Sequence, residues 1–247
     1  MDVDRLSLPK GISGFISGVA SVPRGIGRVL SDAPLRKLAL IPLLITAVLY
    51  IAAIVALVWW GADLLDWAWP KPSDGWLKWL WYVVLPLGIL LIVVVVALLF
   101  STVAEAVGGP FYDRMAIRVL EGEGIPAKDP GLLGGTIPDI LRSLLFVAAA
   151  VGFGVLSFIP VVGIPFAVVG TAIAWVGLAA AAVNPALLVT GYGIGGRLRF
   201  FLRSLGALAG MGLAIGVVLL VPLAGLIAIP GSVVGASALY ARSRRAP

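Results

Sequence analysis

The sequence contains no cysteine and no histidine. Without cysteine, the chain has no disulfide framework and no thiolate metal site. Without histidine, it lacks the usual general base and the commonest metal ligand. No nucleophile stands beside a base and no pair of acids falls inside an apolar run, so we expect no catalysis, no metal site and no cofactor.

Charge is also scarce, since 12% of the residues are charged and 61% are hydrophobic, whereas a soluble domain carries about 25% charged residues. The apolar runs are continuous and do not alternate, which is typical of membrane helices and not of barrel strands. The sequence therefore predicts an all-α integral membrane protein with a single membrane domain over residues 1–247. The net charge of +6 fits cytoplasmic loops rich in Lys and Arg, so we expect no nucleic-acid partner.

Four segments follow from the distribution of charge along the first half of the chain. Residues 11–31 mix small, apolar and basic residues and predict a short interfacial helix, interrupted near Pro23. Long charge-free runs predict transmembrane helices at 36–61 and 79–107, and the tryptophans between residues 59 and 81 predict an interfacial belt. The charged segment 110–122 predicts a surface helix that stops at Gly122 or Gly124.

An internal repeat explains the second half of the chain. Residues 143–196 carry no charge, and these 54 residues are too many for one span. The stretch "FIPVVGIPFAVVGTAIAW" at 158–175 is similar to "LVPLAGLIAIPGSVVGASALY" at 220–240, with prolines and glycines in matching places. The turns contain nothing that favours water. We therefore interpret 138–190 and 204–241 as two re-entrant helical hairpins whose tips stop inside the bilayer.

The placement of basic residues supports this interpretation. With both hairpins re-entrant, 16 Lys and Arg lie on the side of the N-terminus and two, Lys71 and Lys78, on the other. If the first hairpin crosses twice and the last run once, the split becomes 13 to 5. The positive-inside rule favours the first arrangement. Two ordinary spanning hairpins with kinked ends are the alternative.

Three stretches resemble the CysZ-type sulfate permease family, which includes the etoposide-induced membrane proteins of eukaryotes. They are "PLRKLALIPLLITAVLY" at 34–50, "GGPFYDRMAIRVLEG" at 108–122 and "LVPLAGLIAIPGSVVGASALY" at 220–240. The resemblance covers most of the chain in the same order. It implies two long transmembrane helices plus two half-penetrating helix pairs, and sulfate uptake across the bacterial inner membrane for cysteine synthesis.

The resemblance also implies an anion site. The family binds sulfate near a Gly-Leu-Arg motif at the start of the first long helix, and the matching residues here are Pro34, Leu35 and Arg36, followed by Lys37. A helix N-terminus offers unpaired N–H groups to an anion, and an arginine adds a fork of donors. Pro34 lacks an N–H, and Thr46 stands where the family suggests asparagine, so the anion is left open. A plain topology anchor is the alternative role for Arg36 and Lys37.

Five further residues are pore or vestibule candidates. Glu105 ends the second long run and is either a proton or cation site or an interfacial residue. Asn184 either lines a cavity or caps and breaks a helix. Arg197, Arg199 and Arg203 either draw anions toward a vestibule or meet the headgroups of membrane lipid.

We therefore expect a channel-like or ion-coupled permease for sulfate. Two long helices and two half-depth hairpins are too few to enclose a pore, so we expect a homo-oligomer. Gly206 and Gly210, four residues apart, favour close helix contact within or between chains. The alternatives are a permease for another oxyanion, or a membrane scaffold or accessory protein that transports nothing.

Overall fold

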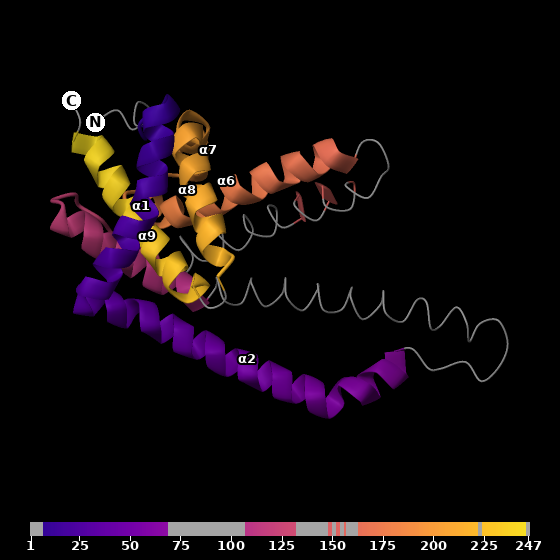
Figure 1. Cartoon of the computed structure of the whole chain (residues 1–247). Coiled ribbons are helices and arrows are strands. Elements are labelled where there is room, and N and C mark those ends of the chain that lie inside the picture. The colour runs from indigo at the N-terminus through magenta and orange to yellow at the C-terminus, as the bar shows by residue number, and fades with distance from the viewer. Residues whose placement is uncertain are drawn as a thin grey trace.

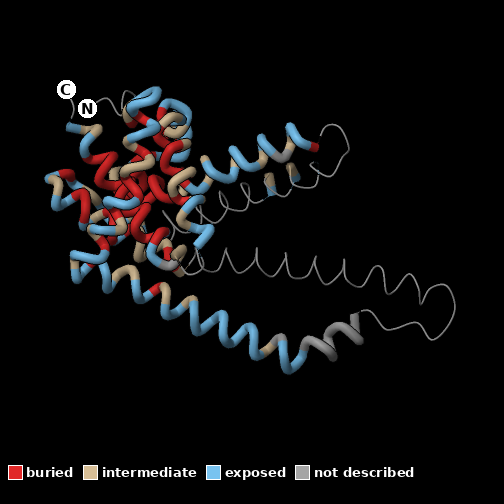
Figure 2. The backbone as a smooth tube through the Cα atoms, in the orientation of Figure 1, coloured by how far each residue is buried: buried red, intermediate tan, exposed pale blue. Residues whose placement is uncertain are grey.

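The structure is a computed structural model of the chain, and it describes residues 7–68, 107–131, 163–221 and 224–245, with five more between 148 and 156. All regular structure in these residues is helical. Two parts are distinct in Figure 1, a compact bundle and the long helices that project from it to one side. Buried residues are concentrated in the bundle, and the projecting helices are largely exposed (Figure 2).

Helix α1 (Gly11–Ser31) packs extensively against both α8 (Leu205–Leu219) and α9 (Gly225–Arg245), and these two contacts exceed the others among α1, α2 and α6–α9. Its buried face consists of small residues and valines at helical spacing, namely Gly14, Gly18, Ser21, Val22, Gly25 and Val29. A side chain at Gly18 or Gly25 would meet the backbone of α8 or α9. The glycines therefore let three helix backbones approach closely.

The structure tests two predictions about α1 and α8, the break at Pro23 and the close contact at the glycines of α8. The helix runs unbroken through Pro23, so the predicted interruption is wrong. Pro23 lies on the exposed side of α1, so its ring stays out of the contacts with α8 and α9. Gly210 meets the backbone of Phe15, so the close contact predicted for the small residues of α8 lies within the chain.

Helix α2 (Ala33–Ala68) is the longest helix and continues through Pro42. Its first 28 residues, Ala33–Trp60, are long and apolar enough to cross a membrane, and only 6% of the most apolar window is buried. Most apolar side chains described between Leu40 and Trp60 are exposed. A helix that is apolar all round and uncovered by its own chain requires lipid or another subunit around it. The second predicted transmembrane helix, 79–107, lies outside the described residues except for its last residue.

Residues 107–122 form a helix, and the predicted surface segment 110–122 lies within it. One side of this helix is not at the surface, because Met115, Ala116, Val119 and Leu120 are buried in the core. Gly124 ends the helix with a positive φ of 72°. The amide of Ile125 donates to the carbonyl of Leu120 at 2.9 Å, which closes the last turn.

The two halves of the sequence repeat begin helices at the same place. Helix α6 (Gly163–Val189) starts at the first glycine of the repeat, and α9 starts at the corresponding Gly225. By length and composition, α6 can cross a membrane alone. Helix α8 has 15 residues, and at about 1.5 Å per residue it is roughly 22 Å long, short of the roughly 30 Å apolar layer of a bilayer. The tip of the first predicted hairpin lies outside the described residues.

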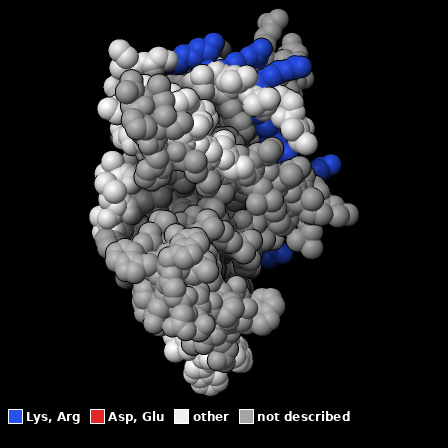
Figure 3. Space-filling model, turned by 90° about the vertical axis from the view of Figure 1, so that its right-hand side faces the viewer, with Lys and Arg blue, Asp and Glu red and all other residues white. Residues whose placement is uncertain are grey.

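Helix α7 (Ile194–Arg203) meets α8 at a bend of 86°. The bend falls at Ser204, whose buried Oγ accepts a hydrogen bond of 3.0 Å from the amide of Leu8. The chain segment before α1 is thereby tied to the α7–α8 corner. Basic side chains of the described residues gather toward one edge of the molecule in the view of Figure 3, and none occurs in α2 after Lys37 or in α6.

Candidate functional site

The N-terminus of α2 is joined to the end of α1 through Asp32. The Asp32 amide donates to the Arg28 carbonyl at 3.0 Å, and the Asp32 carbonyl accepts from the Arg36 amide at 2.9 Å. Asp32 therefore ends one helix and begins the next. In the first turn of a helix the N–H groups have no intrahelical acceptor, and Pro34 removes one of them. The amides of Ala33 and Leu35 are the backbone donors that remain there.

The side chains of the predicted anion site divide into a buried and an exposed set. Leu35 is fully buried in a cluster with Val29, Met115 and Val119, so it anchors α2 to the bundle and only its backbone can serve an anion. Pro34, Arg36 and Lys37 are exposed.

The charges around this helix start favour an anion. Arg36 Nη1 donates to the Leu30 carbonyl at 3.2 Å, which caps α1 and holds the guanidinium beside the start of α2. Asp32 Oδ2 lies 3.4 Å from Arg118 Nε, so this acid has its own cation. Arg36 and Lys37 then provide net positive charge at the positive end of the helix dipole, where an oxyanion is favoured.

The structure brings together two of the predicted vestibule residues. Asn184 of α6 and Arg197 of α7 are both buried, and Arg197 Nη1 donates to Asn184 Oδ1 at 2.8 Å. Next to them Tyr192, Phe200 and Tyr240 stack edge to face, with ring centroids 5.9–6.4 Å apart. A buried guanidinium held in this way joins α6 to α7 and is positioned in the core.

The other candidates lie apart from this pair. Arg199 and Arg203 are exposed on α7, on a different side of the helix from Arg197. The three arginines therefore do not share one side of α7, and their role at a vestibule stays a prediction. Glu105 lies outside the described residues.

Sequence reasoning overlooked a second group of arginines. Arg24 and Arg28 of α1 lie one turn apart, and the tertiary fold places them beside Arg242 at the end of α9. Arg28 and Arg245 share the carboxylate of Glu123, at 3.4 Å and 3.0 Å. The spacing of Arg24 and Arg28 was visible in the sequence, but their neighbour on α9 is more than 200 residues away and gives no local signal.

The fold and the distribution of charge define a helical membrane protein, with a bundle that carries the basic residues and apolar helices that project from it. The chain belongs to the family described as "Sulfate transporter CysZ/Etoposide-induced protein 2.4", which matches residues 21–230. The match includes α2, α6, α7 and α8 and most of α1, so the resemblance seen in the sequence is confirmed at the level of the family.

Individual relatives match a smaller part. The chain is 32% identical over 149 residues to the protein named sulfate transporter CysZ of Pectobacterium atrosepticum, covering 55% of this chain and 52% of that protein. It is 30% identical over 158 residues to the protein of the same name from Pseudomonas fluorescens, covering 60% and 62%. For the one from Salmonella typhimurium the identity is 31% over 170 residues, covering 60% and 64%. The matched regions thus span about half to just under two thirds of these relatives.

Proposed function

We propose that this protein carries sulfate across a bacterial inner membrane as a multi-pass, non-enzymatic permease, and that the start of α2 is where the anion first binds. The main support for this site is the exposed, cationic N-terminus of α2, the helix that is long and apolar enough to cross a membrane. Family membership and the names of the relatives support sulfate as the anion.

In this proposal the protein uses three features of the α2 start. The helix dipole and the amides of Ala33 and Leu35 attract the oxyanion, and the fork of Arg36 orients it. Lys37 adds a mobile charge that can exchange its hydrogen bonds as the anion leaves. Arg199 and Arg203, exposed on α7, add a positive field that raises the local anion concentration.

The uncovered apolar surface of α2 motivates the proposed homo-oligomer. A span with 6% of its most apolar window buried does not enclose a path by itself. We propose that copies of the chain pack their long helices together to complete a wet path, with membrane lipid covering the remaining surface. Passive and ion-coupled passage both fit this arrangement, and we propose that the imported sulfate feeds cysteine synthesis.

Pro34 favours a second candidate of the same chemistry. Its missing N–H leaves one donor fewer than a glycine would supply at this place. A weaker site of this kind would bind another oxyanion, such as sulfite. If the site binds no transported anion, the protein would be a membrane scaffold.

The test is uptake of radiolabelled sulfate into vesicles containing the purified full-length protein, with binding measured by calorimetry in detergent. We expect uptake by the wild type, and a fall of at least about tenfold in affinity in Arg36→Ala, because a charge-assisted hydrogen bond contributes about 1.5–3 kcal/mol. Arg114→Ala is the matched control, since Arg114 is an exposed arginine of helix 107–122.

Four outcomes decide between the candidates. Loss of binding and uptake in Arg36→Ala alone supports the site at the start of α2. Unchanged binding in Arg36→Ala contradicts that site. Absence of wild-type sulfate uptake, with calorimetric binding of another oxyanion such as sulfite, supports the second candidate. Absence of binding by any oxyanion supports the scaffold.

A further inference from the structure

A groove separates α1 from α9 on the side of the bundle where the arginines gather. It is open to the surface and is lined by Ser21, Arg24, Gly25, Arg28, Val234, Gly235, Ala238, Leu239 and Arg242. Its floor is formed where the two helices cross, because a side chain at Gly235 would meet the backbone of Ser21. The floor is therefore backbone and small apolar side chains, and the rim is three guanidinium groups.

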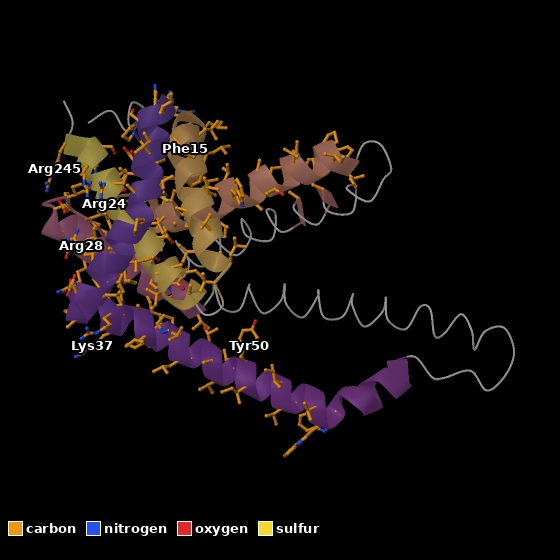
Figure 4. All side chains as sticks on the ribbon, viewed as in Figure 1. Phe15, Arg24, Arg28, Lys37, Tyr50 and Arg245 are labelled. Carbon is orange, nitrogen blue, oxygen red and sulfur yellow. The ribbon has the colours of Figure 1, made fainter. Side chains whose placement is uncertain are left out.

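The rim is strongly cationic and lacks an acidic partner inside the groove. No lining residue is an acid. Glu123 lies at the edge, where it pairs with Arg28 and with Arg245. In the part of the chain that the structure describes, no ion pair reaches Arg24 or Arg242. Arg24, Arg28 and Arg245 lie along the same side of the bundle, with Lys37 further along that side (Figure 4).

Helix-terminus electrostatics explain only part of this arrangement. Arg242, Arg244 and Arg245 occupy the last turn of α9, where positive charge is favoured by the helix dipole. Arg24 is in the middle region of α1 and gains nothing from a helix end. Like charges that converge on one concave surface repel one another, and an anion between them removes that repulsion.

The ligand chemistry follows from the donors. A guanidinium presents paired N–H donors that match two oxygens of a phosphate or sulfate group. Arg24 of α1 and Arg242 of α9 line the groove from its two walls, and Glu123 pairs with Arg28 at its edge. One occupant between the walls could therefore accept hydrogen bonds from both Arg24 and Arg242. A tetrahedral oxyanion has enough oxygens to accept two bonds from each of two forks on separate oxygens, whereas a carboxylate has only two oxygens and a halide is a single atom.

We propose that the α1–α9 groove binds a tetrahedral oxyanion of the sulfate or phosphate kind, with Arg24 and Arg242 as its principal donors. This site is separate from the start of α2, and it does not depend on whether the protein carries sulfate across a membrane. Two sources supply this chemistry, namely the free inorganic anion and the phosphate of an anionic phospholipid headgroup. Basic pockets between helices at a membrane surface bind such headgroups.

The experiment uses the full-length protein in detergent and two probes. The first is sodium sulfate, titrated by calorimetry. The second is phosphatidylglycerol, counted as bound lipid by native mass spectrometry. The variant is Arg24→Gln with Arg242→Gln, and the control is Arg114→Gln with Lys10→Gln, which removes the same charge from exposed positions outside the groove. Arg36→Ala is measured in parallel.

The groove variant is expected to lower affinity for one of the probes by at least about tenfold, while the control changes it less than about twofold. Sulfate binding that survives Arg36→Ala but is lost in the groove variant identifies the free anion. Phosphatidylglycerol retention lost in the groove variant, with sulfate binding unchanged, identifies the lipid phosphate. If neither probe distinguishes the groove variant from its control, the proposal is overturned.

A second variant separates binding from folding. Arg24→Lys with Arg242→Lys keeps both charges but removes the paired donors, so it is expected to bind with intermediate affinity and to melt at the wild-type temperature. Binding equal to the wild type in this variant contradicts the role of the guanidinium forks.

Discussion

Helices α1 and α9 cross at glycines, and this crossing predicts opposite effects on stability for alanine at two nearby positions of α1. A Cβ added at Gly25 would lie 2.8 Å from the Cα of Gly235 and still closer to the carbonyl oxygen of Gly231. A Cβ added at Gly27, two residues further along the same helix, would meet nothing within 4 Å. We therefore compare Gly25→Ala with Gly27→Ala, each of which adds one methyl group to α1.

The helix-propensity gain from glycine to alanine is about 0.8–1 kcal/mol and applies to both variants. Only Gly25→Ala adds overpacking, which typically costs about 1–3 kcal/mol. The obstructing atoms are backbone atoms, which cannot rotate away as a side chain does, so the two helices must separate. Because the propensity gain cancels in the comparison, Gly25→Ala should be about 1–3 kcal/mol less stable than Gly27→Ala.

The assay is thermal melting of the purified full-length protein in one detergent. For a chain of this size, about 2–4 °C of melting temperature corresponds to 1 kcal/mol. We expect Gly27→Ala to melt slightly above the wild type, and Gly25→Ala to melt roughly 2–12 °C below Gly27→Ala. A Gly25→Ala protein as stable as Gly27→Ala would refute the close backbone contact of α1 with α9.

Three further predictions concern stability and use the same melting assay. Asn184→Leu and Arg197→Met should each lower stability by about 1.5–3 kcal/mol, because each removes the buried, charge-assisted hydrogen bond between these two side chains. The double variant should be less destabilised than the sum of the two, and strict additivity would contradict the coupling. Gly124→Ala should cost about 1–2 kcal/mol of stability, because φ is 72° at this position and alanine disfavours a positive φ. Gly109→Ala is the control and should not destabilise the protein. Equal effects of the two substitutions would contradict the role of Gly124 in ending helix 107–122. Glu123→Gln should lower stability by less than about 1 kcal/mol, because both ion pairs of Glu123 are partly exposed. High salt should remove this difference from the wild type. A loss of stability that does not depend on salt would count against this reasoning.

Membrane character, the long first span and the family could be predicted from the sequence because they depend on composition and on contiguous residues. The charge-free run after Lys37 is a local property, and α2 follows it. The repeat could also be seen locally, and α6 and α9 begin at its corresponding glycines. The re-entrant nature of the hairpins stays a prediction, since α6 is long enough to span and α8 is not.

The candidate site could be predicted only in part. Arg36 and Lys37 are exposed at a helix start, as the pattern indicated, because their neighbours in sequence define that start. Arg197 has the same local character as Arg199, yet it is buried against Asn184. Its burial depends on how α6 and α7 meet, which the sequence of α7 alone does not contain.

The sequence by itself determined that this protein belongs in a membrane, because an uncharged run of about 20 residues or more forms a helix long enough to cross a bilayer. It also indicated some helix ends, such as the stop near Gly124 and the start of α2 after Asp32, although Pro23 and Pro42 did not end the helices that contain them. The sequence of α1 predicts a surface helix, and only the tertiary structure shows that α1 packs against both α8 and α9. Its glycine face stabilises the fold only where other helix backbones come close to it. The same crossing decided that Arg24 and Arg242 share one groove, since nothing within a few residues of either predicts the other.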